Sequence, residues 1–438
     1  MGIVRRMFGA CVCIGLVAGC GEMARLPEHA TTGPAPALVP PVNALIPTVN
    51  IAPAKGWPRS AKPVAMDGME VSRFAENLDH PRWLHVLPNG DVLVAETNKP
   101  PKGDLPFSFK RWAMALFMKM AGAGTPSANR ITLLRDTDGD GVADRRSVFV
   151  DNLHSPFGMA LVGDSFYVAN TDAVMRFPYR SGADRIDAPG TRIVELPAGP
   201  NNQHWTRGLL ASADGSKLYV SVGSDSNIAE RGIEAERGRA AIWEIDVPSG
   251  AHRVMATGLR NPVGMALAPG SGALWVVVNE RDEIGSDLVP DYLTSVRDGA
   301  FYGWPYSYFG NVVDTRVEPL RPDLVATAVR PDYALGAHVA PLGLAASKGA
   351  RMPAPLQQGM FIGRHGSWNR RPHSGYDVVF VPFADGRPTG PMLHVVTGFI
   401  SSDGEAFGRP VGVAIDGTGA LLVADDVGNI VWRVKSLR

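Results

Sequence analysis

One sequence phrase recurs six times along the chain, and this repetition constrains the fold more than any other feature. Each copy contains a turn with Pro or Gly, a short apolar strand, a second turn with Gly and a second apolar strand. The copies occupy residues 80–96, 155–170, 206–220, 261–277, 340–363 and 409–424. A single small sheet cannot bury both of its faces, so repeated sheets pack on one another around an axis. The repeats predict an all-β fold, a six-bladed β-propeller, with a pair of β-sandwiches or a solenoid as the alternatives.

Two further segments fit this ring. Residues 71–74 can pair with residues 430–434 inside the last blade, which would join the two ends of the chain and close the ring. Residues 105–121 place apolar side chains at helical spacing, so we expect a short helical insertion in the first blade. This helix would either cap the mouth of a central pocket or cover the side of the ring. Its apolar stripe consists of Trp112, Leu116 and Met120.

Composition agrees with this fold class and excludes one function. Of the 438 residues, 49 are Gly and 36 are Pro, a content that disfavours a helix-rich fold and favours many short strands joined by turns. The 43 basic and 43 acidic side chains cancel, so the chain lacks the basic surplus that a general nucleic-acid binder needs to neutralise phosphates. We therefore expect no nucleic-acid partner.

The first twenty residues hold all three cysteines and have the order of an export signal. Arg5 and Arg6 precede an apolar run that is too short to span a bilayer. The run ends in Leu16-Val17-Ala18-Gly19-Cys20, which resembles the bacterial lipobox, in which the Cys is lipidated. The alternative is an ordinary signal peptide with a chance Cys. We expect residues 1–19 to be a lipoprotein signal peptide and Cys20 to be anchored by lipid to the membrane of the cell envelope, on the periplasmic side, with the outer membrane left open as the destination.

The rest of the chain contains no cysteine, so the exported part has neither a disulfide nor a covalently attached haem. Residues 20–66 are rich in Ala, Pro and Thr, a composition typical of an extended tether between a membrane and a domain. The propeller is expected to occupy residues 67–438.

Polar residues at the start of the innermost strand of each blade should converge at one end of the ring. This set is cationic and contains imidazoles but has few carboxylates, so it is unsuited to a metal cage of its own. It suits a planar ligand with several negative charges and a proton-transfer step. The set consists of His204, Arg207, Arg260, Asn261, His338, Arg370 and Arg409.

The phrases around these positions resemble the soluble, quinoprotein-type glucose/sorbosone dehydrogenases, and most of all the L-sorbosone dehydrogenase-like branch. The resemblance covers residues 70–438, and two of its phrases, Leu259-Arg260-Asn261-Pro262 and Tyr302-Gly303-Trp304-Pro305, are fairly specific. The others lie at 203–209, 279–285, 366–376 and 408–412. The resemblance implies a six-bladed propeller that holds pyrroloquinoline quinone (PQQ) and Ca²⁺ and oxidises a sugar or sugar aldehyde by transferring a hydride to PQQ.

The same resemblance implies residue roles. His204 matches the general base that takes the proton of the sugar hydroxyl, and Arg260 matches the group that polarises the quinone oxygen, with Asn261 beside it. Positions that line the cofactor or hold its carboxylates are matched by Arg207, His338, Arg370 and Arg409, with Asn369 and Arg371 as alternatives to Arg370.

The loop at Asp282 and Glu283 matches the one whose backbone carbonyls bind the cofactor Ca²⁺ in the family. The better-known sugar dehydrogenases have Gly-Pro there, so ligation by these two carboxylates is also open.

A second metal motif lies in the first blade. Asp136, Asp138 and Asp140 alternate before Gly141, with Asp144 at the ninth position, as in Ca²⁺ loops. Position twelve is Ser147 instead of the usual bidentate Glu. The motif predicts either a structural Ca²⁺ site or an acidic hairpin turn.

Two other function classes remain open. A Ca²⁺-dependent propeller lactonase would need an axial metal site built from carboxylates or amides, and a non-enzymatic lipoprotein serving as an assembly platform would leave the converging arginines unexplained. If the chain is a dehydrogenase, the lack of a haem motif requires a separate electron acceptor, a cytochrome or a membrane quinone. The sequence does not identify the sugar.

Overall fold

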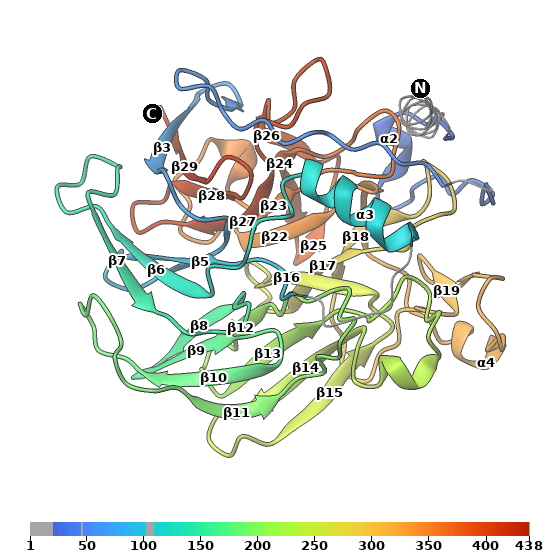
Figure 1. Cartoon of the computed structure of the whole chain (residues 1–438), viewed down its shortest axis with the longest axis horizontal. Coiled ribbons are helices and arrows are strands. Elements are labelled where there is room, and N and C mark those ends of the chain that lie inside the picture. Colours follow the sequence, from blue (N-terminus) through green and yellow to red (C-terminus); the bar gives the residue numbers. More distant parts are fainter. Residues whose placement is uncertain (1–20, 45–46, 102–108, 438) are drawn as a thin grey trace, which may run out of the picture.

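The computed structural model describes residues 21–44, 47–101 and 109–437, and it shows six antiparallel sheets arranged as blades around an axis (Figure 1). This confirms the six-bladed propeller. Cys20 and the expected signal peptide lie outside the described residues. None of the helices in these ranges has the length and apolarity needed to cross a bilayer.

The first three blades are each a meander of four consecutive strands. Blade 1 contains β4 (Pro81–Val86), β5 (Val92–Glu96), β6 (Arg130–Arg135) and β7 (Arg145–Val150). Blade 2 contains β8 (Met159–Val162), β9 (Ser165–Ala169), β10 (Ala173–Pro178) and β11 (Thr191–Glu195). Blade 3 contains β12 (Leu209–Ala211), β13 (Lys217–Val222), β14 (Ala241–Asp246) and β15 (His252–Thr257), with a 3₁₀ turn, η1 (Ile233–Glu236), between β13 and β14.

The other three blades take in longer connections or extra strands. Blade 4 contains β16 (Asn261–Leu267), β17 (Leu274–Asn279), β18 (Pro290–Ser295) and β21 (Tyr333–Ala337), and its long connection carries β19 (Ser307–Tyr308), β20 (Val312–Val313) and α4 (Pro322–Val325). Blade 5 contains β22 (Pro341–Ala346), β23 (Gly359–Arg364), β24 (Asp377–Ala384) and β26 (Leu393–Thr397), with η2 (Ala354–Leu356) and β25 (Arg387–Pro388). Blade 6 contains β27 (Pro410–Ile415), β28 (Leu421–Asp425), β29 (Ile430–Ser436) and β3 (Met69–Ala75).

The closure of the ring follows the pairing expected from the sequence. In blade 6, β3 pairs antiparallel with β29, with Val71 opposite Val434 and Arg73 opposite Trp432. The strand nearest the N-terminus therefore completes the last blade, and the first and last parts of the propeller hold each other in place.

The recurring glycine of the repeat lies where one blade meets the next. A Cβ on Gly208, Gly264, Gly343 or Gly412 would overlap the backbone of the innermost strand of the following blade. At Gly343 the nearest atom is the carbonyl oxygen of Val411 in β27. The repeat therefore keeps a residue without a side chain at these positions because the innermost strands approach one another closely around the axis.

The helical insertion is also confirmed. Between β5 and β6, α3 (Phe109–Met120) leaves blade 1 and lies in front of the ring (Figure 1). The carbonyl of Met120, its last residue, accepts a hydrogen bond of 2.8 Å from the amide of Ala54. The expected stripe is exposed to solvent by 49% at Trp112, 42% at Leu116 and 46% at Met120, so it does not pack into the core.

Residues before β3 do not form the extended tether expected from their composition. Residues 21–44 and 47–57, here called the N-terminal strap, pack on the loops of blades 4, 5 and 6. Within and after it, α2 (Glu28–Thr31) is followed by β1 (Thr32–Gly33), which pairs with β21, and β2 (Val64–Ala65) pairs with β26. The tether prediction is wrong for these residues because their backbone groups find partners more than two hundred residues away, which composition cannot reveal.

Candidate active site

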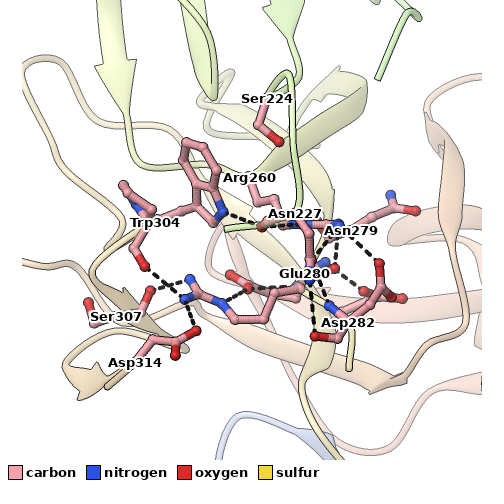
Figure 2. A network of polar contacts seen from close by, with 12 residues as sticks. Ser224, Asn227, Arg260, Asn279, Glu280, Asp282, Trp304, Ser307 and Asp314 are labelled. Atoms are coloured by element: carbon pink, nitrogen blue, oxygen red, sulfur yellow. Dashed lines mark hydrogen bonds and ion pairs between the residues drawn. The ribbon is translucent and has the colours of Figure 1, made fainter. Parts of the chain in front are cut away.

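Arg260 and Asp282 form a buried ion pair at one end of the ring. Arg260 directly precedes β16 and Asp282 follows β17, so both lie where strands of blade 4 end. The guanidinium Nη2 of Arg260 lies 2.9 Å from Oδ2 of Asp282 (Figure 2). Burial raises the pKa of Asp282, but the charge of Arg260 and the hydrogen bond from His338 outweigh it and hold this pKa well below its ordinary value. Asp282 is therefore an anion that neutralises Arg260.

The same carboxylate joins two residues expected from the sequence. Asn369, in the loop after β23, donates from Nδ2 to Oδ1 of Asp282 at 2.8 Å. His338, between β21 and β22, has Nδ1 at 3.5 Å from that oxygen and donates from Nε2 to the carbonyl of Gly285 at 2.9 Å. Burial lowers the pKa of His338, but hydrogen bonding and attraction to Asp282 raise it above its ordinary value. The structure thus joins Arg260, Asp282, His338 and Asn369 into one charged group.

His204 is half-buried and lies beside this group in the loop before β12. Its Nδ1 lies 2.8 Å from the carbonyl oxygen of Ser224. Because a carbonyl only accepts, Nδ1 carries the hydrogen and Nε2 presents its lone pair. Burial, together with the positive charge of Arg260, holds the pKa of His204 well below its ordinary value. The imidazole is therefore neutral at physiological pH and can act as a base.

Asn261 and His204 flank the same glycine. A Cβ on Gly223 would overlap both Oδ1 of Asn261 and Cβ of His204, so only glycine lets the two side chains come this close. Oδ1 of Asn261 is buried, and no described residue donates a hydrogen bond to it. A buried acceptor without a partner is costly, so this oxygen points to a ligand that would satisfy it.

Two arginines that were expected to contact the cofactor bind other parts of the protein instead. Arg207 is fully buried and donates to the carbonyl oxygens of Pro197, His204 and Thr206. Burial lowers its pKa to about 9. Arg370 donates to the carbonyls of Ser286 and Pro372 and faces Asp287 at 3.6 Å. Both guanidinium groups hold loops of the site in place and are directed at protein partners.

Among the three arginines expected to hold cofactor carboxylates, Arg207, Arg370 and Arg409, the last has the longest hydrogen bonds to the protein. Its guanidinium reaches the carbonyls of Gly366 and Ala52 only at 3.5 and 3.3 Å, and no described residue accepts from its buried Nε. The guanidinium carbon lies 4.8 Å from the centre of the Tyr376 ring, which supports it by a cation–π contact. Such a charge is able to bind a carboxylate of a ligand.

The structure also reveals a site residue that the sequence reasoning missed. Asn227, in the loop after β13, accepts from Arg260 at both its backbone oxygen (3.1 Å) and its side-chain oxygen (2.9 Å). The same side chain accepts from the amide of Asp282 at 2.9 Å, and Trp304 donates to its backbone oxygen (Figure 2). Asn227 thus fixes the orientation of Arg260 towards Asp282. A lone Asn in a loop of Ser and Asp gave no signal in the sequence.

The expectation of few axial carboxylates is wrong. Asp426, just after β28, is buried and accepts from Arg82 at 2.5 Å and from His365 at 2.9 Å, with Nε2 of His80 at 3.6 Å. Burial raises the pKa of Asp426, but its contacts with His365, His80 and Arg82 outweigh burial and hold this pKa well below its ordinary value. The sequence reasoning missed this cluster because Arg409 was the only site residue that it predicted in blades 1 and 6. A carboxylate surrounded by Arg and His is neutralised by the protein and differs from a metal cage.

The N-terminal strap crosses the same end of the ring. Ser286 donates to the carbonyl of Glu22 at 2.7 Å, and the amide of Asn50 donates to the carbonyl of Trp368 at 2.8 Å. Between the strap and the loops at Glu283 and Trp368 remains a cavity of about 20 Å³. The strap therefore lies as a cover on the loops that carry Asp282 and Asn369.

In the second metal motif, Asp136, Asp138 and Asp140 bring one carboxylate oxygen each within 4.8 Å of one another. Asp144 lies apart from this group and accepts instead from Thr137 within the turn. Carboxylates of this loop also accept from the amides of Gly139, Gly141 and Val142, as in a hairpin turn. The loop forms an acidic turn, and Ca²⁺ binding by Asp136, Asp138 and Asp140 stays a prediction.

The fold and these groups define a β-propeller of the soluble quinoprotein type. The model of the TrAA12-like family matches residues 126–292 and 324–436, more than half of the chain, and the chain belongs to this family. The family resemblance seen in the sequence is thereby confirmed.

Curated relatives agree with this assignment. An uncharacterized protein of Borreliella burgdorferi is 30% identical over 242 residues, which cover 55% of this chain and 62% of that protein. The pyrroloquinoline quinone-dependent pyranose dehydrogenase of Coprinopsis cinerea is 27% identical over 315 residues, covering 58% of this chain and 43% of that protein. The chain thus spans about half the length of the curated relatives it matches.

Solved structures share the fold. The calcium structure of a Trichoderma reesei enzyme of carbohydrate-active family AA12 has a TM-score of 0.69 and 21% identity, covering 88% of this chain and 98% of that one. The holo form of the PQQ domain of the Coprinopsis cinerea pyranose dehydrogenase has a TM-score of 0.66 and 21% identity, covering 88% of this chain and all of that one. At this identity the likeness concerns the fold alone.

Proposed function

We propose that this protein binds PQQ and oxidises a sugar or a sugar aldehyde, as the names of its curated relatives suggest. The observation that carries the proposal is the neutral imidazole of His204, whose Nδ1 is held by Ser224 and whose pKa is lowered by burial and by the buried charge of Arg260. A base that takes a hydroxyl proton and a cation that stabilises the developing negative charge are the two groups that such an oxidation asks of the protein.

The polar groups of the site fit a flat ligand with several carboxylates. Among the residues expected to bind the cofactor, three carry a buried polar atom that also lacks a hydrogen-bond partner in the described part of the chain: Oδ1 of Asn261, Oδ1 of Asn369 and Nε of Arg409. Asn369 contacts Asp282 directly, Asn261 follows Arg260 in the chain, and Arg409 lies against Gly366 in the loop that also carries Asn369. An acidic quinone would supply acceptors to Arg409, whereas the two amide oxygens need a donor, such as a ring N–H or a substrate hydroxyl.

PQQ would supply a two-electron acceptor at this site, and the protein supplies the rest. Nε2 of His204 accepts the proton of the substrate hydroxyl, while the hydrogen bond from Nδ1 to Ser224 holds the ring in the required tautomer. Arg260, fixed by Asn227 and Asp282, places a permanent positive charge beside the reacting groups. The half-buried position of His204 limits the access of water.

The residues fit Ca²⁺ less well than they fit PQQ. Oδ2 of Asp282 accepts from Arg260 and Oδ1 accepts from Asn369, so both oxygens already face donors. A cation bound to this carboxylate would have to displace the guanidinium. Asp282 therefore acts as the partner of Arg260 and Asn369, and Ca²⁺ ligation by Glu283, which is exposed to solvent, stays a prediction.

The position in the cell is part of the proposal. The lipobox-like sequence at Cys20 supports a lipid-anchored protein of the cell envelope, which would pass its electrons to a separate cytochrome or membrane quinone. Because the sequence resembles the L-sorbosone dehydrogenase-like branch, a sugar aldehyde of the sorbosone type is the expected substrate.

The test begins with purified protein from which any bound quinone has been removed. PQQ should bind stoichiometrically, as followed by its absorbance and by calorimetry, and the loaded protein should reduce a dye with aldoses. Arg409→Ala should weaken PQQ binding by about tenfold or more, because it removes a charge-assisted contact to a carboxylate. If the protein does not bind PQQ, the proposal fails. Hydrolysis of lactones by the same protein would then favour the lactonase alternative.

A further inference from the structure

A cleft of about 500 Å³ opens beside the buried pair of Arg260 and Asp282. Residues 228–233, in the loop between β13 and β14, form one wall, and residues 305–321, in the long connection of blade 4, form the other. This volume falls within the range of roughly 300–1,000 Å³ that small-molecule sites occupy. It exceeds the space that one pyranose ring fills.

Both walls of the cleft continue from loops of the candidate active site. The loop that holds His204 through Ser224 and Arg260 through Asn227 continues directly into the first wall. The second wall follows Trp304, whose indole donates to the backbone oxygen of Asn227 at 2.9 Å (Figure 2). Its Arg316 donates to the backbone oxygen of Asp282 at 3.3 Å. A ligand in the cleft therefore lies against the same loops that position the base and the cation.

A fully buried arginine keeps the second wall in place. Arg281 donates to the carbonyl oxygens of Pro305 and Ser307 and to the carboxylate of Asp314 at 2.8 Å. Arg316 forms two further hydrogen bonds with Asp314, at 2.9 and 2.7 Å. The wall is thus pre-organised, and binding does not have to order it.

The lining of the cleft combines an apolar floor with a charged rim. Tyr306 and Val317 are buried and form one apolar cluster, against which Ile228 packs. The rim carries two acidic and two basic side chains. They belong to Glu230, Glu318, Arg316 and Arg321. Each arginine is paired with an aspartate, Arg316 with Asp314 and Arg321 with Asp323. A ligand with one apolar face and many hydroxyl groups that can donate to Glu230 and Glu318 matches this lining better than an anionic ligand.

We propose that this cleft binds the additional sugar units of an oligosaccharide whose reducing end enters the active site. The proposal rests on the proposed sugar oxidation and names its substrate class. The C–H face of a pyranose would lie on the apolar floor, and its hydroxyl groups would accept from Arg316 and Arg321 and donate to Glu230 and Glu318. The cleft would then lower KM for oligosaccharides relative to a single sugar.

The test blocks the cleft without touching the base or the cation. Ile233 lines the cleft and is 49% exposed, so Ile233→Trp narrows the space without disturbing the core. Val254→Trp is the matched control, because Val254 is 40% exposed on β15 and does not line the cleft. Glu318→Ala, on the exposed rim, is a second variant that removes one hydroxyl partner. The unfolding temperature of each variant checks its fold.

Two measurements are compared. Calorimetry uses the methyl glycosides of maltotriose and cellotriose on protein without PQQ, because these sugars lack a reactive anomeric hydroxyl. We expect one of them to bind to the wild type and to Val254→Trp, and Ile233→Trp to weaken this binding by about tenfold or more. With PQQ bound, Ile233→Trp should raise KM for the corresponding free trisaccharide by a similar factor and leave kcat for glucose unchanged.

The outcomes separate this inference from the proposed function. If glucose is oxidised but neither trisaccharide binds, or if Ile233→Trp and Glu318→Ala both behave like the wild type, the cleft is not a saccharide site and the proposed function stands. If a trisaccharide binds in the cleft but no sugar is oxidised with PQQ present, the proposed function fails and the cleft remains a saccharide site.

Discussion

At the scale of single residues, the state of His204 depends on two neighbours. The carbonyl of Ser224 fixes the tautomer, and the charge of Arg260 adds to burial in keeping the ring neutral. Arg260 in turn keeps its own position through Asn227 and Asp282. The base therefore depends on the cation, and a change at Arg260 alters the protonation of His204.

Replacing His204 by Ala should separate cofactor binding from turnover. Removing a general base typically costs about 10²–10⁴ in rate, so kcat with PQQ bound should fall by this factor. PQQ affinity should change little, since His204 contributes no carboxylate contact. Stopped-flow dye reduction measures the first quantity and absorbance titration the second. A His204→Ala protein that reduces dye as fast as the wild type would contradict the role of His204 as the base.

The pH dependence of kcat/KM follows from the lowered pKa of His204. The neutral imidazole is the active form, so activity is lost as the pH falls through its pKa, which lies well below the ordinary 6.5. The pH profile of kcat/KM should therefore show no loss of activity on its acidic side near neutral pH. Arg260→Gln removes a charge that lowers this pKa, so its acidic limb should move to higher pH. A wild-type limb centred above 6.5, or an Arg260→Gln limb shifted to lower pH, would contradict this assignment.

At the scale of elements, the N-terminal strap is the segment that covers the site and that its composition did not predict to be there. It covers the loops at 282–287 and 366–371 and is held at its far end by Trp57. The indole of Trp57 packs edge-on against Phe399 and Trp432 and donates to Asp425 at 2.6 Å. A cavity of about 20 Å³ beneath the strap has room for about one water molecule, so a tricyclic cofactor would displace the strap on entry there.

Trp57→Ala should loosen the strap. Loss of a half-buried indole and its hydrogen bond should lower the unfolding free energy by about 2 kcal/mol and increase the association rate of PQQ. Trp57→Phe, which keeps a ring but loses the N–H, is the control. Its unfolding free energy and its PQQ association rate should lie between those of the wild type and Trp57→Ala. Thermal unfolding and stopped-flow PQQ binding provide the measurements. Equal association rates in all three proteins would show that the strap does not control entry.

At the scale of the whole molecule, the ring depends on close contact between the innermost strands of successive blades. The interior-facing glycines permit this contact, and pairing of β3 with β29 closes the ring. The apolar core lies between blades: one cluster, for example, joins Phe361 and Phe380 of blade 5 to Trp432 of blade 6. Stability is therefore distributed around the ring, and a defect at one contact strains both neighbouring blades.

Gly343→Ala should destabilise the ring. The added Cβ would overlap the carbonyl oxygen of Val411, and forced overpacking of this kind costs about 1–3 kcal/mol or more. Gly199→Ala is the matched control, because a Cβ there meets no atom within 4 Å and its backbone conformation suits other residues. The midpoint of denaturant unfolding measures both. A Gly343→Ala protein as stable as Gly199→Ala would contradict the proposed packing role of the repeated glycine.

The sequence by itself determined the periodic parts of this protein. The repeat predicted six blades, the closure of the ring and the inserted helix, because strand periodicity, turn residues and inter-blade glycines are local requirements that each copy must meet. It also predicted that His204, Arg260, Asn261, His338 and Arg409 converge at one end of the ring, and the family resemblance offered Asn369 as an alternative to Arg370. Only the tertiary structure decided how their charges are partnered: Asn227, Asp426 and the N-terminal strap reach the site through contacts between distant segments, and Arg207 and Arg370 bind the protein instead of facing a ligand. Hydrogen bonds between such segments leave no periodic trace, since each needs only one suitable residue at one place in space.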